Sequence, residues 1–368
     1  MLTHFSHSSQ FHKILIIQNG TVRDIIRILP IVNILRLRFP HVKIAWLASP
    51  EMIDFLNHYN IADRIIVAKP GWYKKLYEIK ALRKKLRSFA PDLCLDLQGT
   101  VSSGFAAKFS GCDKRISIHG TKSRLFDNLK KSEQAVNQLE KHLNLLESLG
   151  VAGASIDYDF PEIFLERRES GRVLRELGLE STPFAMFSIG VQSYSTHWEI
   201  ERYVQVAEHL WQTHHLPTVA VWQFAKDKQI AEKIENESGG MVALAPLLSA
   251  IPLVALARKT SVFVGTDSDF LHIAAAVGAP CIGILCDENA RRDAPCCNNF
   301  QAVMATMGKS RWKRRGIKAG ASPVRIDNYT YDVIQVCNAC DDILQPVVAP
   351  ATQKSIQISL SENRLVKV

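Results

Sequence analysis

A polar run between two apolar segments, Asp267 to His272, has the residue types of a ligand site. The segment Ser261 to Val264 before it predicts a buried strand, and Phe270 to Val277 predicts a helix rich in small residues. A helix amino terminus offers unpaired N–H groups and the positive end of the helix dipole, which suits a phosphate group. Asp267 or Ser268 equally suits ordinary helix capping. The pattern alone leaves both interpretations open.

The cysteines are a second group of residues that could do chemistry, as disulfides or as metal ligands. The eight cysteines are too few for a disulfide framework in a chain of 368 residues, so we expect free thiols. Cys296-Cys297 and Cys337-x-x-Cys340 could be combined into a four-thiolate zinc site. The first pair lacks the paired spacing of such sites, and the two pairs are far apart in sequence, so we expect no metal.

Short apolar runs that alternate with amphipathic stretches must position these residues. In the first part of the chain, the predicted strands are 13–17, 42–47, 64–68 and 92–97, and the predicted helices are 23–38, 51–58 and 74–89. Regular alternation with short connections is typical of a parallel sheet covered by helices on both faces. Such sheets bind ligands outside the carboxyl ends of their strands.

The same alternation restarts after a connector. A helical stretch at 132–149 ends at Gly150, and Ala152 to Ser155 has linker composition, so we place a domain boundary there. The predicted strands that follow are 184–189, 217–222, 261–264 and 281–285, and the predicted helices are 168–177, 199–213, 227–237, 251–257, 270–277 and 331–344. We therefore expect an α/β fold of two Rossmann-like, doubly wound domains, 1–150 and 151–345, with a tail at 346–368.

Composition fits a folded, water-soluble chain with an anionic partner. Hydrophobic residues make up 47% and the formal net charge is +9. No uncharged apolar run is long enough to span a bilayer, and residues 1–12 lack the features of a secretory signal, so we expect a cytoplasmic location. A phosphorylated substrate or an anionic membrane surface fits the charge. Nucleic acid is not expected because no binding motif accompanies the charge.

The polar run and its surroundings resemble the signature of glycosyltransferase family 9, the ADP-heptose:lipopolysaccharide heptosyltransferases. The matching positions are Asp267, Ser268, His272, Ala274 to Ala276, Gly278 and Pro280. Other segments resemble the family's pattern in the same order along the chain: Ile14 to Ile17, Asp24 with Leu29-Pro30, Asp96 to Gly99, Gly190 to Trp198 and Cys340 to Leu344.

The resemblance implies a GT-B fold, with a cleft between an acceptor-side first domain and a nucleotide-sugar-binding second domain. It implies inverting transfer of a heptose or related sugar from an ADP-sugar to a lipopolysaccharide inner-core acceptor, without metal or cofactor. Asp24 would be the general base. Arg23 and Gln98 would bind the acceptor. Donor-binding residues would be Ser193, Thr196, His197, Trp222, Asp267, Ser268, Asp269 and His272. The acceptor that the resemblance implies is an anionic glycolipid, so peripheral contact with the inner membrane is a further expectation.

Several positions differ from the family pattern, among them Gln223 to Asp227 after the strand that ends at Trp222. Arg23 and Asp269 each stand where the family has glycine, and Thr196 stands where it has lysine. A carboxylate at 269 is electrostatically unfavourable beside a phosphate. These differences support an alternative hypothesis, in which the chain has an altered donor, or has lost catalysis and acts as a binding protein.

Overall fold

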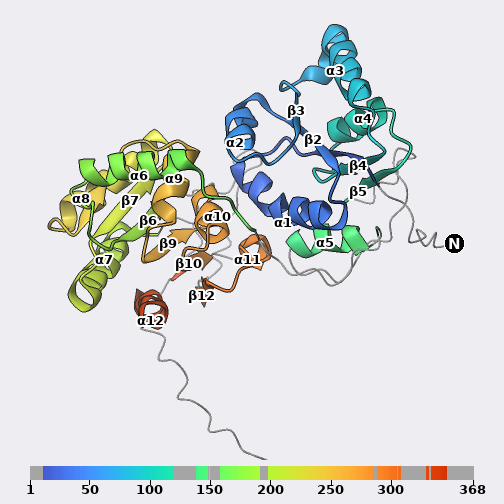
Figure 1. Cartoon of the computed structure of the whole chain (residues 1–368). Helices are drawn as coiled ribbons and strands as arrows, with labels where there is room; N and C mark the ends of the chain where they lie inside the picture. The colour runs from blue at the N-terminus through green and yellow to red at the C-terminus, as the bar shows by residue number, and fades with distance from the viewer. Residues whose placement is uncertain are drawn as a thin grey trace, which may run out of the picture.

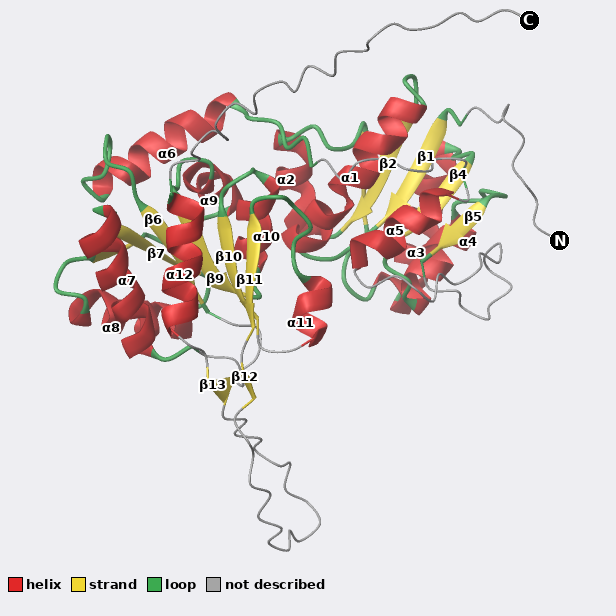
Figure 2. Cartoon of the chain, turned by 90° about the horizontal axis from the view of Figure 1, so that it is seen from below, coloured by secondary structure: helices red, strands yellow, loops and turns green. Residues whose placement is uncertain are grey.

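The computed structural model describes residues 11–118, 138–147, 149, 158–190, 198–285, 288–304, 306–307, 329–330 and 333–345. These residues form two parallel sheets, each covered by helices on both faces (Figures 1 and 2). The expected doubly wound α/β architecture is therefore confirmed. The proposed boundary at Ala152 to Ser155 lies outside the described residues.

The first sheet has five parallel strands in the order β3-β2-β1-β4-β5. Its strands are β1 (Lys13–Ile17), β2 (Lys43–Ala48), β3 (Arg64–Val67), β4 (Leu93–Asp96) and β5 (Arg115–Ser117). The helical elements around it are α1 (Val22–Arg38), η1 (Pro50–Met52), α2 (Ile53–His58), η2 (Trp72–Lys74), α3 (Leu76–Phe89), α4 (Val101–Phe109) and α5 (Gln138–Glu147).

Alternate side chains of β1 explain why this sheet needs helices on both faces. Ile14 and Ile16 join the apolar cluster that includes α1, whereas Leu15 and Ile17 join the cluster that includes α3 and α4. All four are fully buried. A strand covered on both sides is apolar throughout, which is why the run at 13–17 was readable from sequence.

The second sheet has six parallel strands in the order β11-β10-β9-β6-β7-β8. Its strands are β6 (Ala185–Ile189), β7 (Thr218–Trp222), β8 (Val242–Leu244), β9 (Val262–Thr266), β10 (Cys281–Leu285) and β11 (Phe300–Met304). Its helices are α6 (Phe164–Glu176), α7 (Ile200–His214), α8 (Ala225–Glu237), α9 (Ala250–Ala257), α10 (Asp269–Ala276), α11 (Glu288–Asp293) and α12 (Val333–Leu344). A separate antiparallel pair is formed by β12 (Thr306–Met307) and β13 (Tyr329–Thr330).

Three edge strands, β5, β8 and β11, lie outside the elements predicted from sequence. The first two have only three residues each, and β11 is only partly buried. Neither length nor apolar pattern distinguishes these strands from loops, because β5 and β8 are too short to show a period and β11 has a mixed burial pattern.

The two sheets meet through α1 and α10, which pack against each other (Figure 1). One apolar cluster runs through both helices, from Ile25 and Leu29 on α1 to Phe270 and Ile273 on α10. The loops that precede these two helices are consequently close together.

Candidate active site

Both sheets have a topological switch point, where the strand order reverses and ligands of this architecture bind. In the first sheet it lies between β1 and β4, and in the second between β6 and β9. Gln18 and Gly20 follow β1, and Gln98 follows β4. Gly190 follows β6, and Ser268 follows β9. Pockets are found at both places.

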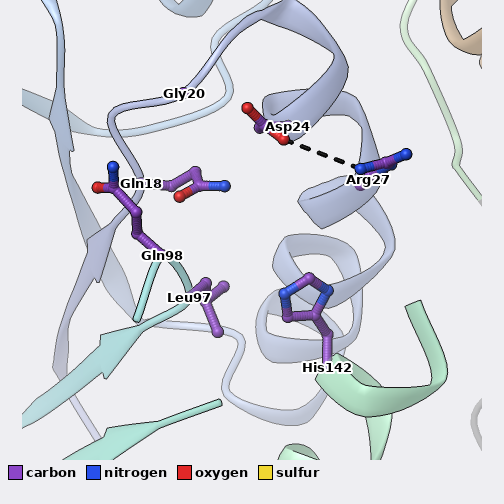
Figure 3. Close-up of a pocket in the computed structure, with 7 residues that line it drawn as sticks. All are labelled: Gln18, Gly20, Asp24, Arg27, Leu97, Gln98 and His142. Atoms are coloured by element: carbon purple, nitrogen blue, oxygen red, sulfur yellow. Dashed lines mark ion pairs between the residues drawn. The ribbon is translucent and has the colours of Figure 1, made fainter. Parts of the chain in front are cut away.

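The first pocket has a volume of about 230 Å³ and is lined by Gln18, Gly20, Asp24, Arg27, Leu97, Gln98 and His142 (Figure 3). Asp24 lies in the first turn of α1, where its Oδ2 accepts the Thr21 N–H at 2.8 Å. Its Oδ1 lies 4.0 Å from Arg27 Nη1. Asp24 therefore caps its own helix and also presents a carboxylate to the pocket.

Gly20 leaves the space that the Asp24 carboxylate occupies. A Cβ at position 20 would lie 1.9 Å from Asp24 Oδ2 and 2.6 Å from its Cγ. Any larger residue would therefore displace the carboxylate. Gly20 was not predicted as a site residue, although a glycine four residues before a helix-start aspartate is a usable signal.

Amide groups complete the first pocket. Gln98 Oε1 accepts the Asn19 N–H at 3.3 Å, which joins the β1 and β4 loops. The Gln98 turn is held by Asp96, a fully buried carboxylate whose Oδ1 accepts the N–H groups of Gln98 and Gly99. Gln18 Oε1 is buried and has no hydrogen-bond partner among the described residues. An acceptor without a donor, beside a carboxylate, suits a ligand that carries hydroxyl groups.

The second pocket is small, about 20 Å³, and is lined by Ser188, Ile189, Gly190, Gln223, Phe224, Asp227, Ser268, Asp269 and Phe270. Ser268 is the N-cap of α10, because its Oγ accepts the Leu271 N–H at 3.3 Å. The same hydroxyl lies 2.9 Å from Ser188 Oγ. Helix capping, one of the two interpretations of this run, is thus observed. It is compatible with an anion at the remaining N–H groups.

Arg23 and Asp269, two of the positions that differ from the family pattern, are in contact. Arg23 Nε lies 2.9 Å from Asp269 Oδ1, and its Nη1 lies 3.2 Å from Asp267 Oδ1. The Arg23 side chain is 8% exposed and that of Asp269 13%. Arg23 was predicted on the acceptor side, and the structure places its guanidinium against the start of α10 (residues 269–276).

His272 is buried in the first turn of α10, 3.8 Å from Asp267 Oδ1 and 3.4 Å from Arg27 Nη2. Burial, assisted by the charges of Arg27 and Arg23, lowers the pKa of His272 to about 4. Burial alone would raise the pKa of Asp267, but His272 and Arg23 lower it below its ordinary value. At neutral pH the imidazole is neutral and Asp267 is charged.

The remaining predicted donor residues are Trp222, Ser193, Thr196 and His197, and none of them is seen at the start of α10 among the described residues. Trp222 ends β7 and donates from Nε1 to the Ala245 carbonyl at 2.8 Å, so its polar atom is used within the protein. Trp198, which ends the segment that resembles the family pattern but was not itself a predicted donor residue, is buried in the core against Tyr203. Ser193, Thr196 and His197 lie outside the described residues.

A group with metal-ligand chemistry occurs away from the cleft. His209 and His214 on α7 both contact Asp341 on α12. In the part of the chain that the structure describes, this is the one group of three or more such side chains whose ligand atoms converge, and the four cysteines weighed above do not form one.

Comparison with known proteins decides the family. A family model described as glycosyltransferase family 9 (heptosyltransferase) matches residues 79–320. The chain belongs to glycosyltransferase family 9. It is therefore a glycosyltransferase. Lipopolysaccharide heptosyltransferase 3 of Escherichia coli K12 is 23% identical over 276 residues, which cover 71% of this chain and 78% of that protein.

Solved structures of family 9 proteins have the same fold. The family 9 glycosyltransferase of Veillonella parvula superposes with a TM-score of 0.72 at 16% identity, covering 91% of this chain and 97% of the other. E. coli ADP-heptose lps heptosyltransferase II superposes with a TM-score of 0.67 at 18% identity, covering 90% of this chain and 98% of the other. E. coli heptosyltransferase WaaC with ADP-2-deoxy-2-fluoro heptose superposes with a TM-score of 0.64 at 17% identity, covering 80% of this chain and 93% of the other. The GT-B expectation is confirmed.

None of the described helices is both long enough and apolar enough to cross a membrane.

Proposed function

We propose that this family 9 glycosyltransferase transfers a heptose or related sugar from an ADP-sugar to a lipopolysaccharide inner-core acceptor, with inversion and without metal. The names of its relatives, lipopolysaccharide heptosyltransferase 3 and a heptosyltransferase with an ADP-heptose analogue, support this substrate class. The observation that carries the proposal is the Asp24 carboxylate, which faces a polar pocket on the α1 side while α10 begins on the other side of the same interface.

Each side of the interface has a role in the proposed reaction. Asp24 accepts the proton of the acceptor hydroxyl as that oxygen bonds to the anomeric carbon. The bond from the anomeric carbon to the diphosphate breaks, and ADP leaves with the electron pair. The N–H groups at the start of α10 stabilise the growing phosphate charge. Gln98 and Gln18 bind acceptor hydroxyls, and Ser193, Thr196 and His197 remain proposed donor residues on sequence grounds.

Replacement of Asp24 tests the mechanism. In Asp24→Asn we expect turnover to fall by about 100-fold or more, because general-base assistance is lost. ADP affinity and thermal stability should stay close to those of the wild type. Asp54→Asn is a matched control, since Asp54 is an exposed aspartate in the first turn of α2. Full turnover in Asp24→Asn would remove the general-base role.

The alternative is an altered donor, or a binding protein that has lost turnover. The specific observation in its favour is that Asp269 places a carboxylate at the start of α10. A thermal-shift screen with ADP-, UDP- and GDP-sugars identifies the nucleotide, since a ligand that binds the folded state raises the melting temperature. Stabilisation without transfer or hydrolysis would favour the binding protein.

A further inference from the structure

The Arg23 guanidinium carries a buried NH₂ group that finds no acceptor in the part of the chain that the structure describes. Nε and Nη1 pair with Asp269 and Asp267, while Nη2 is buried without a hydrogen-bond partner among the described residues. The residue is only 7% exposed. A buried donor without an acceptor is costly, so an additional anionic group beside Arg23 would be stabilised.

This cation, from the first sheet's α1, lies at the amino terminus of the second sheet's α10. Asp267 and Asp269 flank Ser268, the N-cap of that helix. Two independent features therefore attract an anion to one place: the free N–H groups of the helix start, and a buried guanidinium with an unused donor.

We propose that Arg23 binds the donor diphosphate across the cleft, and that Asp269 holds Arg23 in position while the donor is absent. The inference rests on the proposed function, because it assumes a nucleotide diphosphate at α10. It assigns Arg23 to the donor, in place of the acceptor role expected from sequence.

Charge explains why the two substitutions occur together. Asp269 alone would repel a diphosphate, and Arg23 alone would be a buried cation with Asp267 as its one carboxylate partner among the described residues. As a pair they neutralise each other. A diphosphate presents several anionic oxygens and can engage a guanidinium at two points, so it competes well with a single carboxylate oxygen for Arg23. Asp269 is then left in the first turn of α10, where the helix dipole favours a carboxylate.

Calorimetric titration with ADP and with adenosine separates phosphate binding from nucleoside binding. In Arg23→Gln we expect ADP affinity to fall by about tenfold or more, because a charge-assisted hydrogen bond is lost. Adenosine affinity should not change. Asp269→Asn should bind ADP more tightly than the wild type, and Arg23→Gln/Asp269→Asn should lose less than Arg23→Gln alone.

Arg36→Gln is the matched control. Arg36 lies on the same helix, donates to the Ile61 carbonyl and is remote from α10, so ADP affinity should be unchanged. If Arg23 only fastens the two sheets, Arg23→Gln will lower the melting temperature and will change ADP and adenosine affinity in parallel. If Arg23→Gln binds ADP with wild-type affinity, the role of Arg23 is overturned, but the proposed function is not. A wild-type chain that binds no nucleotide diphosphate overturns the proposed function as well.

The structure also assigns a divalent-cation site between α7 and α12, on an independent observation. Nε2 of His209 and Nε2 of His214 each lie 2.7 Å from Asp341 Oδ1. The ligand atoms of the three residues lie within 4.8 Å of one another, and all three side chains are partly exposed. Two imidazole nitrogens and a carboxylate oxygen suit Zn²⁺, with coordination positions left for water.

A cation here would fasten α12 to α7. Titration with Zn²⁺ against a chromophoric chelator should give one tight site per chain, and Zn²⁺ should raise the melting temperature. Asp341→Asn and His209→Gln should lose both effects, whereas His41→Gln, at an exposed histidine, should keep them. Equal Zn²⁺ affinity in wild type and Asp341→Asn, or no binding by the wild type, means that the three residues form hydrogen bonds only.

Discussion

The Asp24 side chain both caps α1 and faces the first pocket. Its Oδ2 caps α1 through the Thr21 N–H, which fixes the carboxylate, and the same group faces the pocket with Gln18 and Gln98. In the proposed role of general base, a carboxylate held by its own helix start needs little reorganisation before it accepts a proton. The aspartate could be found from sequence, but its orientation could not, because it depends on the free space above Gly20.

Gly20→Ala tests whether that space matters. The added Cβ would overlap the Asp24 carboxylate, so we expect the carboxylate to move and turnover to fall by about 100-fold. Gly171→Ala is the control, because a Cβ there meets only Arg175 Nη2, at 3.9 Å. It should leave turnover unchanged. Steady-state kinetics with both variants, at equal folded fraction by circular dichroism, decides the matter; equal turnover would show that Asp24 need not occupy this position.

The residues of helix α10 were predicted from sequence, but which helix packs against it was not. Its capping, its small residues and its place after β9 were all predicted, since they depend on neighbours in the chain. Its contact with α1 was not, because Arg23 and Asp269 are far apart in sequence. Asp269 looked unfavourable when considered alone, and its contact with Arg23 shows how the charge is compensated. The short edge strands were missed for a simpler reason, the lack of a buried apolar pattern.

Burial of His272 inside this contact makes stability depend on pH. Its pKa is about 4 in the folded chain and about 6.5 when unfolded. Between these values the unfolded chain binds more protons, so the free energy of unfolding falls as the pH is lowered through this window. Urea denaturation at pH 7 and at pH 4.5 measures this effect. From pH 7 to pH 4.5, the free energy of unfolding of His272→Gln should fall by roughly 2 to 3 kcal/mol less than that of the wild type.

The exposed His41 gives the control for this measurement. His41→Gln should retain the wild-type dependence on pH. The same loss in His272→Gln as in the wild type would mean that other groups govern acid stability.

At the scale of the whole molecule, the two sheets are held together by a second contact besides α1 and α10. Residues 158–161 lie against the first sheet's helices: Asn33 donates to the Tyr158 carbonyl, and the Phe160 ring packs on Phe55 and Tyr59. The segment is tied to the second sheet by Arg258 at the end of α9. The position of Asp24 relative to α10 therefore depends on residues remote from both.

Arg258 is the residue through which this second contact can be tested. It donates to the Phe160 carbonyl at 2.7 Å and pairs at 2.7 Å with Glu166, whose side chain is 2% exposed. Arg258→Ala leaves that buried carboxylate without a cation, which should cost about 3 kcal/mol in urea denaturation. Because residues 158–161 lose their anchor on α9, the radius of gyration in small-angle scattering should rise, and turnover should fall while ADP affinity is kept.

Lys259→Ala, at the exposed neighbouring residue, is the control and should change none of these quantities. If Arg258→Ala is destabilised but keeps the wild-type radius and turnover, then α1 and α10 alone set the geometry of the cleft.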